Sequence, residues 1–191
     1  MRRMRSGLAA AVAVALLAVM QPAATAAEAP VVGPAWTASD LDYHWRGLPT
    51  WSQGYGPMRN LARQAYKNDD SLHYETRRYG INIGWTDWPR SQIYVYGEGL
   101  PRDAPITPTT RVALYFPGGG YLKHGAREWG IGLVWSSTPV YEWLIEPAGS
   151  SGDQLVHNIG TPDASIDAYL AMGPDTGAGP MLRWGPGPVR Y

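Results

Sequence analysis

Residues 72–95, LHYETRRYGINIGWTDWPRSQIYV, and residues 122–145, LKHGAREWGIGLVWSSTPVYEWLI, are two copies of one pattern, and this repeat decides the fold. The copies align without a gap, and their identical positions are Leu72/Leu122, Arg77/Arg127, Gly80/Gly130, Ile81/Ile131, Trp85/Trp135 and Pro89/Pro139. A weaker third copy follows, in which Leu170 matches Leu122 and Trp184 matches Trp135. Repeats of about 50 residues indicate one supersecondary unit that is used several times.

Each copy is predicted to form four short β-strands. In the second copy we expect them at residues 111–116, 121–124, 130–136 and 140–146. Val112, Leu114 and Phe116 show the period-two alternation of a half-buried strand, and the breaks consist of turn formers. In the first copy the matching ranges are 60–66, 71–74, 80–86 and 91–96. The propensities of residues 60–66 also allow a short helix, but the repeat favours a strand. A chain with 23 Gly and 17 Pro suits an all-β fold with many turns better than a helical one.

Three copies of four strands resemble the β-trefoil, the architecture of the ricin-type lectins, over residues 58–191. The resemblance implies a barrel made by the first and fourth strands of each copy, with the other two strands forming hairpins that cap it. The Gln-x-Trp motif of that family is not repeated, since the second copy has Tyr141-Glu142-Trp143 and the first has Gln92-Ile93-Tyr94. Prolines 186 and 188 interrupt the last strand, so only residues 188–191 remain to close the barrel. A β-sandwich is the alternative fold.

Residues 1–27 have the layout of a secretory signal peptide. Three arginines precede an apolar run over residues 8–19, and small residues follow it at 24–27. We therefore expect a secreted, extracellular mature chain, with an uncleaved membrane anchor as the alternative. Removing three of the 16 basic residues and none of the 16 acidic ones leaves a net charge of 13 − 16 = −3. This mildly acidic balance argues against nucleic acid and anionic membrane as partners.

Residues 28–57 precede the repeats as an N-terminal extension rich in aromatic residues, proline and glycine. It contains Trp36, Trp45 and Trp51, too many aromatic residues for a free linker, so we expect it to pack against the barrel. The chain has no cysteine, which excludes disulfides, thiolate metal sites and cysteine nucleophiles. No cofactor is predicted.

Residues found in one copy are better candidates for ligand binding than residues shared by all three. The equivalent Trp85, Trp135 and Trp184 are interpreted as structural, with three sugar-stacking sites as the alternative. The predicted ligand contacts are Asp87, Trp88, Trp129 and Tyr55, with Arg77 and Arg127 as polar anchors. An aromatic ring packs on the apolar face of a pyranose while a carboxylate accepts bonds from sugar hydroxyls. The leading hypothesis is thus a non-enzymatic module that binds carbohydrate or cell-wall polysaccharide. The alternative for each ring is that it seals the core beneath a long loop.

Two other function classes stay open. A protease inhibitor would present the loop of residues 97–108, in which Pro101 and Pro105 stiffen the chain around Arg102. A secreted hydrolase would use Asp40, Asp42 and His44, which alternate and would share one face of a strand. The same three residues are also a possible metal cluster.

Overall fold

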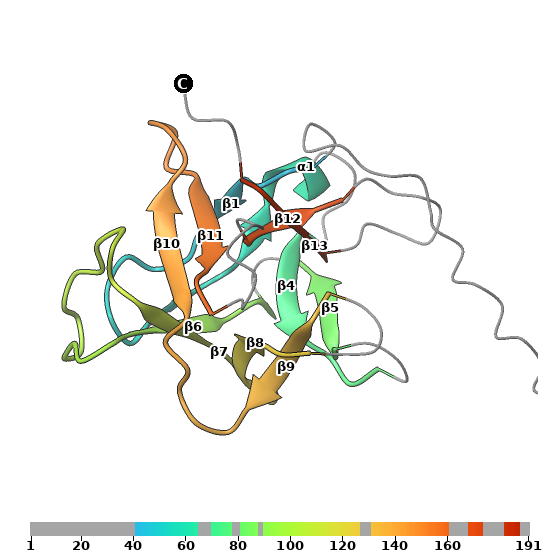
Figure 1. Ribbon diagram of the computed structural model, residues 1–191. Coiled ribbons are helices and arrows are strands. Elements are labelled where there is room, and N and C mark those ends of the chain that lie inside the picture. Colours follow the sequence, from blue (N-terminus) through green and yellow to red (C-terminus); the bar gives the residue numbers. More distant parts are fainter. Residues whose placement is uncertain are drawn as a thin grey trace, which may run out of the picture. The chain divides into compact units, whose positions relative to one another are not determined.

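The computed structural model describes residues 41–64, 70–77, 81–87, 90–126, 131–160, 168–173 and 182–187. All of them belong to the compact unit that spans residues 35–191. The described part of the chain is almost entirely β-structure, as the repeat predicts, and its strands pair antiparallel in a branched sheet that is not closed (Figure 1). None of the helices in the described residues is long and apolar enough to cross a membrane.

The elements are short and follow one another closely. They are β1 (Trp45–Arg46), β2 (Gly54–Gly56), β3 (Arg59–Asn60), α1 (Leu61–Gln64), β4 (Ser71–Tyr74), β5 (Ile83–Thr86), β6 (Ile93–Gly97), β7 (Val112–Phe116), β8 (Gly120–His124), β9 (Leu133–Ser136), β10 (Trp143–Pro147), β11 (Gln154–Asn158), β12 (Tyr169–Met172) and β13 (Leu182–Gly185). Their bounds agree within a few residues with the strands predicted from the first two copies, except over residues 60–66.

The prediction of a strand over residues 60–66 is wrong, because β3 ends at Asn60 and the single turn α1 follows it. The side-chain oxygen of Asn60 accepts a hydrogen bond from the backbone N–H of Arg63 at 3.2 Å. This is the bond that an asparagine N-cap makes to the third residue of a helix. The local cap, which the repeat does not contain, overrides the strand predicted by alignment.

The sheet joins segments that are far apart in the sequence. Its main path is β2-β6-β7-β10-β11-β1-β3-β4-β5, with β8 and β9 branching from β7, and β12 and β13 branching from β11. Strands β1 and β2 lie inside the predicted N-terminal extension, yet β1 pairs with both β11 and β3, and β2 pairs with β6. Part of the extension is therefore built into the sheet.

Three hairpins, β4–β5, β8–β9 and β12–β13, share one register (Figure 1). In each, a leucine of the first strand lies opposite a tryptophan of the second, giving the pairs Leu72–Trp85, Leu122–Trp135 and Leu170–Trp184. The three leucines are fully buried, and the three tryptophans pack half-buried against the same hydrophobic core. The three leucines occupy equivalent positions in the sequence alignment of the copies, and so do the three tryptophans.

The turn between β7 and β8 depends on glycine. Gly120 has a φ of 103°, and a Cβ placed on it would lie 2.6 Å from the carbonyl oxygen of Ser136. Both features exclude an ordinary side chain at this position. The turn directs β8 back along β7, so that Leu122 pairs with Leu114 and both enter the core.

Candidate functional site

Four tyrosines from four adjacent strands lie opposite one another across the sheet. Tyr55 of β2 pairs with Tyr94 of β6, Tyr94 pairs with Tyr115 of β7, and Tyr115 pairs with Tyr121 of β8. We call these four residues the tyrosine row. Because directly opposed residues project to the same face of a sheet, the four rings form one line that crosses the strands.

The rings of the row touch their neighbours. The ring centroids of Tyr55 and Tyr94 are 5.4 Å apart, those of Tyr94 and Tyr115 are 6.1 Å apart, and those of Tyr115 and Tyr121 are 5.0 Å apart. Tyr96 extends the row to one side, with its centroid 6.5 Å from that of Tyr115 and 5.8 Å from that of Tyr121. These separations lie in the range of favourable aromatic pairs.

Strand alternation explains why these rings face outward. Val95, between Tyr94 and Tyr96, is completely buried, and so are the two neighbours of Tyr115, Leu114 and Phe116. A strand that buries one set of alternate residues must turn the other set away from the core. The buried aliphatic residues hold the strands in place, and the tyrosines cover their outer side.

The row combines exposure with neutral hydroxyl groups. The Tyr55 side chain is 58 % exposed, whereas the other three rings are half-buried by their neighbours. Burial raises the pKa of Tyr96 and of Tyr121, and the neighbouring tyrosines raise the pKa of both further. The Arg102 guanidinium opposes this shift in the pKa of Tyr96. At neutral pH these phenols are therefore uncharged groups that can donate and accept hydrogen bonds.

Only part of the predicted ligand site lies in the described residues. Tyr55 belongs to the tyrosine row, whereas Trp88, Trp129 and Arg127 lie outside the described residues. Asp87 follows β5 and forms an exposed ion pair with Arg90 at 3.8 Å. Its own backbone N–H and the Thr86 hydroxyl lower the pKa of the Asp87 carboxyl, burial opposes them, and Arg90 adds a lesser lowering effect.

Arg77 pairs with Glu75, with 3.4 Å between its Nε and the carboxylate oxygen. Arg77 follows β4 and Asp87 follows β5, so the two residues come after the two strands of one hairpin.

The loop predicted for protease inhibition is anchored by residues 50–53. Ser52 donates its backbone N–H to the Ala104 carbonyl at 2.8 Å and accepts the N–H of Asp103 at 2.9 Å. Pro101, Arg102 and Asp103 are exposed. Their chain closes in a turn, since the N–H of Ala104 reaches the carbonyl of Pro101 at 3.3 Å and Asp103 has a φ of 63°. Pro105 forms an isolated β-bridge with Trp51. These contacts hold Arg102 on a tight turn, and the inhibitor hypothesis stays a prediction.

Asp42 and His44, proposed for a hydrolase or a metal, contact each other. Asp42 accepts the backbone N–H of His44 at 2.7 Å, and its carboxylate oxygen lies 3.3 Å from His44 Nδ1. Asp40 lies outside the described residues, and within the described ranges no three metal-ligating side chains gather at one point. The hydrolase hypothesis is not tested by these contacts.

A second polar cluster near this segment has a structural role. The Arg46 guanidinium donates to Asp153 at 2.9 Å and 2.5 Å, and the Ser151 hydroxyl donates to the same carboxylate at 2.5 Å. The Ser151 bond and then Arg46 hold the pKa of the Asp153 carboxyl below its usual 3.8, against the opposing effect of burial. The cluster ties the strand β1 to the loop before β11.

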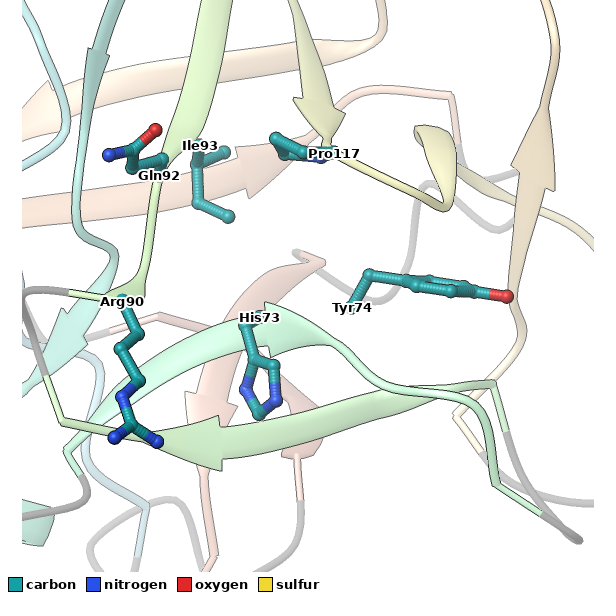
Figure 2. Close-up of a pocket in the computed structure, with 6 residues that line it drawn as sticks. All are labelled: His73, Tyr74, Arg90, Gln92, Ile93 and Pro117. Atoms are coloured by element: carbon teal, nitrogen blue, oxygen red, sulfur yellow. The ribbon is translucent and has the colours of Figure 1, made fainter.

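A pocket of about 160 Å³ is lined by His73, Tyr74, Arg90, Gln92, Ile93 and Pro117 (Figure 2). Gln92 precedes Tyr94 by two residues and Pro117 follows Tyr115 by two, so the pocket adjoins the strand ends that carry the row. His73 Nδ1 is buried and has no hydrogen-bond partner among the described residues. Figure 2 shows His73 and Tyr74 on one strand and Pro117 across the pocket from them.

Sequence reasoning missed Tyr94, Tyr96, Tyr115 and Tyr121 as candidate ligand contacts. The signal was present, because these tyrosines alternate with buried residues on strands that the repeat itself predicts. Comparison of the chain with protein-family models, with curated proteins and with solved structures finds no match.

Proposed function

We propose that this chain is a secreted, non-enzymatic binding module whose ligand is a carbohydrate, and that the tyrosine row is the binding surface. The observation that carries the proposal is the alignment of four tyrosines on neighbouring strands, each directly opposite the next. The three arginines at the start of the sequence and the apolar run over residues 8–19 support export of the chain.

The chemistry of the row matches that of a sugar. A pyranose presents C–H groups on its ring faces and hydroxyls at its edge, and a tyrosine presents an apolar ring with a hydroxyl at its tip. The outer side of β2, β6, β7 and β8 therefore offers alternating apolar and hydrogen-bonding groups. Tyr55, at the exposed end of the row, is the most accessible of the four rings.

We further propose that the fold is a β-trefoil-like arrangement of three equivalent units. The second and third hairpins are each bonded to the preceding one in the same way: the Trp135 indole N–H donates to the carbonyl of Ile81 at 2.6 Å, and the Trp184 indole N–H donates to the carbonyl of Ile131. Both carbonyls lie four residues before the tryptophan of the preceding hairpin, since 85 − 81 equals 135 − 131. A repeated bond of this kind supports a pseudo-threefold relation.

The N-terminal strand β1 supplies the last strand of the third unit in this arrangement. In the second unit, Trp143 pairs with the first strand, β7, and donates its indole N–H to Leu122 at 2.7 Å. In the third unit, Trp45 pairs with β11 and donates to Leu170, also at 2.7 Å. Residues 188–191, predicted to fill this place, lie outside the described residues. The described sheet does not pair β3 with β6, the contact that would close a barrel.

A glycan array probed with the full chain tests the function, followed by titration of a bound glycan against variants. Tyr55→Ala is expected to weaken binding about three- to tenfold, because one ring contact contributes roughly 0.5–1.5 kcal/mol. Ile159→Ala is the matched control, since Ile159 is another exposed apolar side chain, at 42 %, and lies outside the row. An array without any glycan bound above background, or equal affinity in Tyr55→Ala and the parent chain, would refute the proposal.

A further inference from the structure

The tyrosine row has a direction. Its members come from four strands in the order β2, β6, β7 and β8, so the line of rings runs perpendicular to the strands. Neighbouring strands are about 4.8 Å apart, and three intervals span about 14 Å. A ligand that contacts all four rings must therefore be elongated and must lie across the strands.

The rings of the row are tilted against one another. The planes of Tyr55 and Tyr94 meet at 40°, those of Tyr94 and Tyr115 at 65°, and those of Tyr115 and Tyr121 at 56°. The flat face of a crystalline polysaccharide would need coplanar rings to stack on several of them at once. A single chain can rotate about its glycosidic bonds and present a differently oriented sugar to each ring.

The row is also electrically neutral. It consists of four phenols, and burial and neighbouring tyrosines raise the pKa of Tyr121 at one end of the row and of the adjoining Tyr96. The Arg102 guanidinium, which lowers the pKa of the adjoining Tyr96, is a single cation beside this line of four rings. A polyanionic chain would need a cation near each repeat to compensate its charge. The surface is thus better matched to sugars that carry no charge.

We infer that the tyrosine row binds one uncharged, linear polysaccharide chain lying across the strands, with successive sugars packed on Tyr55, Tyr94, Tyr115 and Tyr121. This inference rests on the proposed carbohydrate-binding function and adds to it the shape, charge and orientation of the ligand. The polysaccharide chain is held by its repeating sugars and not by a terminal group.

Length dependence of binding tests the inference. The full chain is titrated calorimetrically with soluble cello-oligosaccharides and chito-oligosaccharides from disaccharide to hexasaccharide. Affinity for at least one series is expected to rise about three- to tenfold with each added sugar until the oligosaccharide covers the row, and then to level off. An affinity that is equal for disaccharide and hexasaccharide would overturn the inference, although binding itself would still support the proposed function.

Variants at different points of the row give a second readout. Tyr55 lies at the exposed end, so Tyr55→Ala is expected to shorten the oligosaccharide length at which affinity levels off. Tyr55→Phe keeps the ring and is the matched variant, for which the plateau should stay at the parent length. Equal loss of affinity in Tyr55→Ala for every length would contradict a chain that extends along the row.

The class of glycan bound separates the two proposals. Adsorption to crystalline cellulose or chitin without affinity for the soluble oligosaccharides would overturn the single-chain arrangement. Binding restricted to branched or anionic glycans on the array would also overturn it. In both cases the proposed function would stand, whereas the absence of binding to all of these probes would remove both proposals.

Discussion

Replacing Trp45 by alanine probes whether the N-terminal strand β1 is an integral part of the fold. Trp45 is completely buried, stacks on Trp85 with 6.4 Å between ring centroids, and donates its indole N–H to the Leu170 carbonyl at 2.7 Å. Truncating a buried tryptophan to alanine costs about 3–5 kcal/mol. The Leu170 carbonyl loses its indole donor as well, which adds about 1 kcal/mol to the loss. Trp45→Ala should therefore lower the free energy of unfolding by roughly 4–6 kcal/mol.

Urea unfolding followed by far-ultraviolet circular dichroism measures this loss without depending on tryptophan fluorescence. Trp143→Ala is the matched variant, because Trp143 is equally buried and makes the same bond to Leu122 at 2.7 Å. The two substitutions are expected to cost similar amounts. A loss below about 1 kcal/mol for Trp45→Ala, beside a full loss for Trp143→Ala, would refute the assignment of β1 to the third unit.

Three further outcomes follow from contacts described above. Asp153→Asn is expected to destabilise the chain by about 1 kcal/mol at pH 7. Because folding lowers the pKa of the Asp153 carboxyl, this difference in stability should disappear as pH falls through the folded pKa. Urea unfolding of the parent chain and the variant, at pH 7 and at a pH below the folded pKa, checks it. Gly120→Ala should cost about 1–3 kcal/mol more than Gly99→Ala in thermal unfolding, since both glycines have positive φ but no atom lies within 4 Å of a Cβ on Gly99. Trp135→Phe should cost about 1 kcal/mol in urea unfolding through loss of its indole hydrogen bond, and an unchanged midpoint would contradict the proposed linkage between hairpins.

The repeat predicted where the strands of the first two hairpins lie, and the pairing within each hairpin is local. Leu72 and Trp85 are 85 − 72 = 13 residues apart, and the same spacing recurs between Leu122 and Trp135. A one-residue slip would move the buried leucine to the solvent face, so the pattern itself specifies the pairing. The all-β class follows from the same alternation and from the abundance of turn residues.

The tyrosine row could not be assembled from the sequence, because its members pair over long distances. Tyr55 meets Tyr94 only because β2, from the segment before the repeats, adds to the edge of β6. No local sequence pattern predicts the pairing of β2 with β6, and β2, with three residues, is too short to show the period-two alternation of a strand. The outward direction of Tyr94 and Tyr115 was predictable from alternation, whereas their alignment across strands was not.

The strand predicted over residues 60–66 is wrong for a local reason, because the helix α1 forms there instead. The asparagine side chain at position 60 caps the turn, and this local bond depends on one residue and not on the repeated pattern. Asp87 and Arg77 form exposed ion pairs with Arg90 and Glu75, and their predicted role as ligand contacts stays a prediction.

Pairing of β1 with β11 has a consequence for how the molecule acquires its fold. Trp45 and Gln154 are separated by 154 − 45 = 109 residues, so β1 cannot form its hydrogen bonds to β11 until the chain up to residue 154 is present. Contacts of such long sequence separation slow folding, because the intervening loop must be closed first. A ribosome-bound chain that still lacks residue 154 cannot complete this sheet, and cooperative folding of the sheet is postponed until that residue has been added.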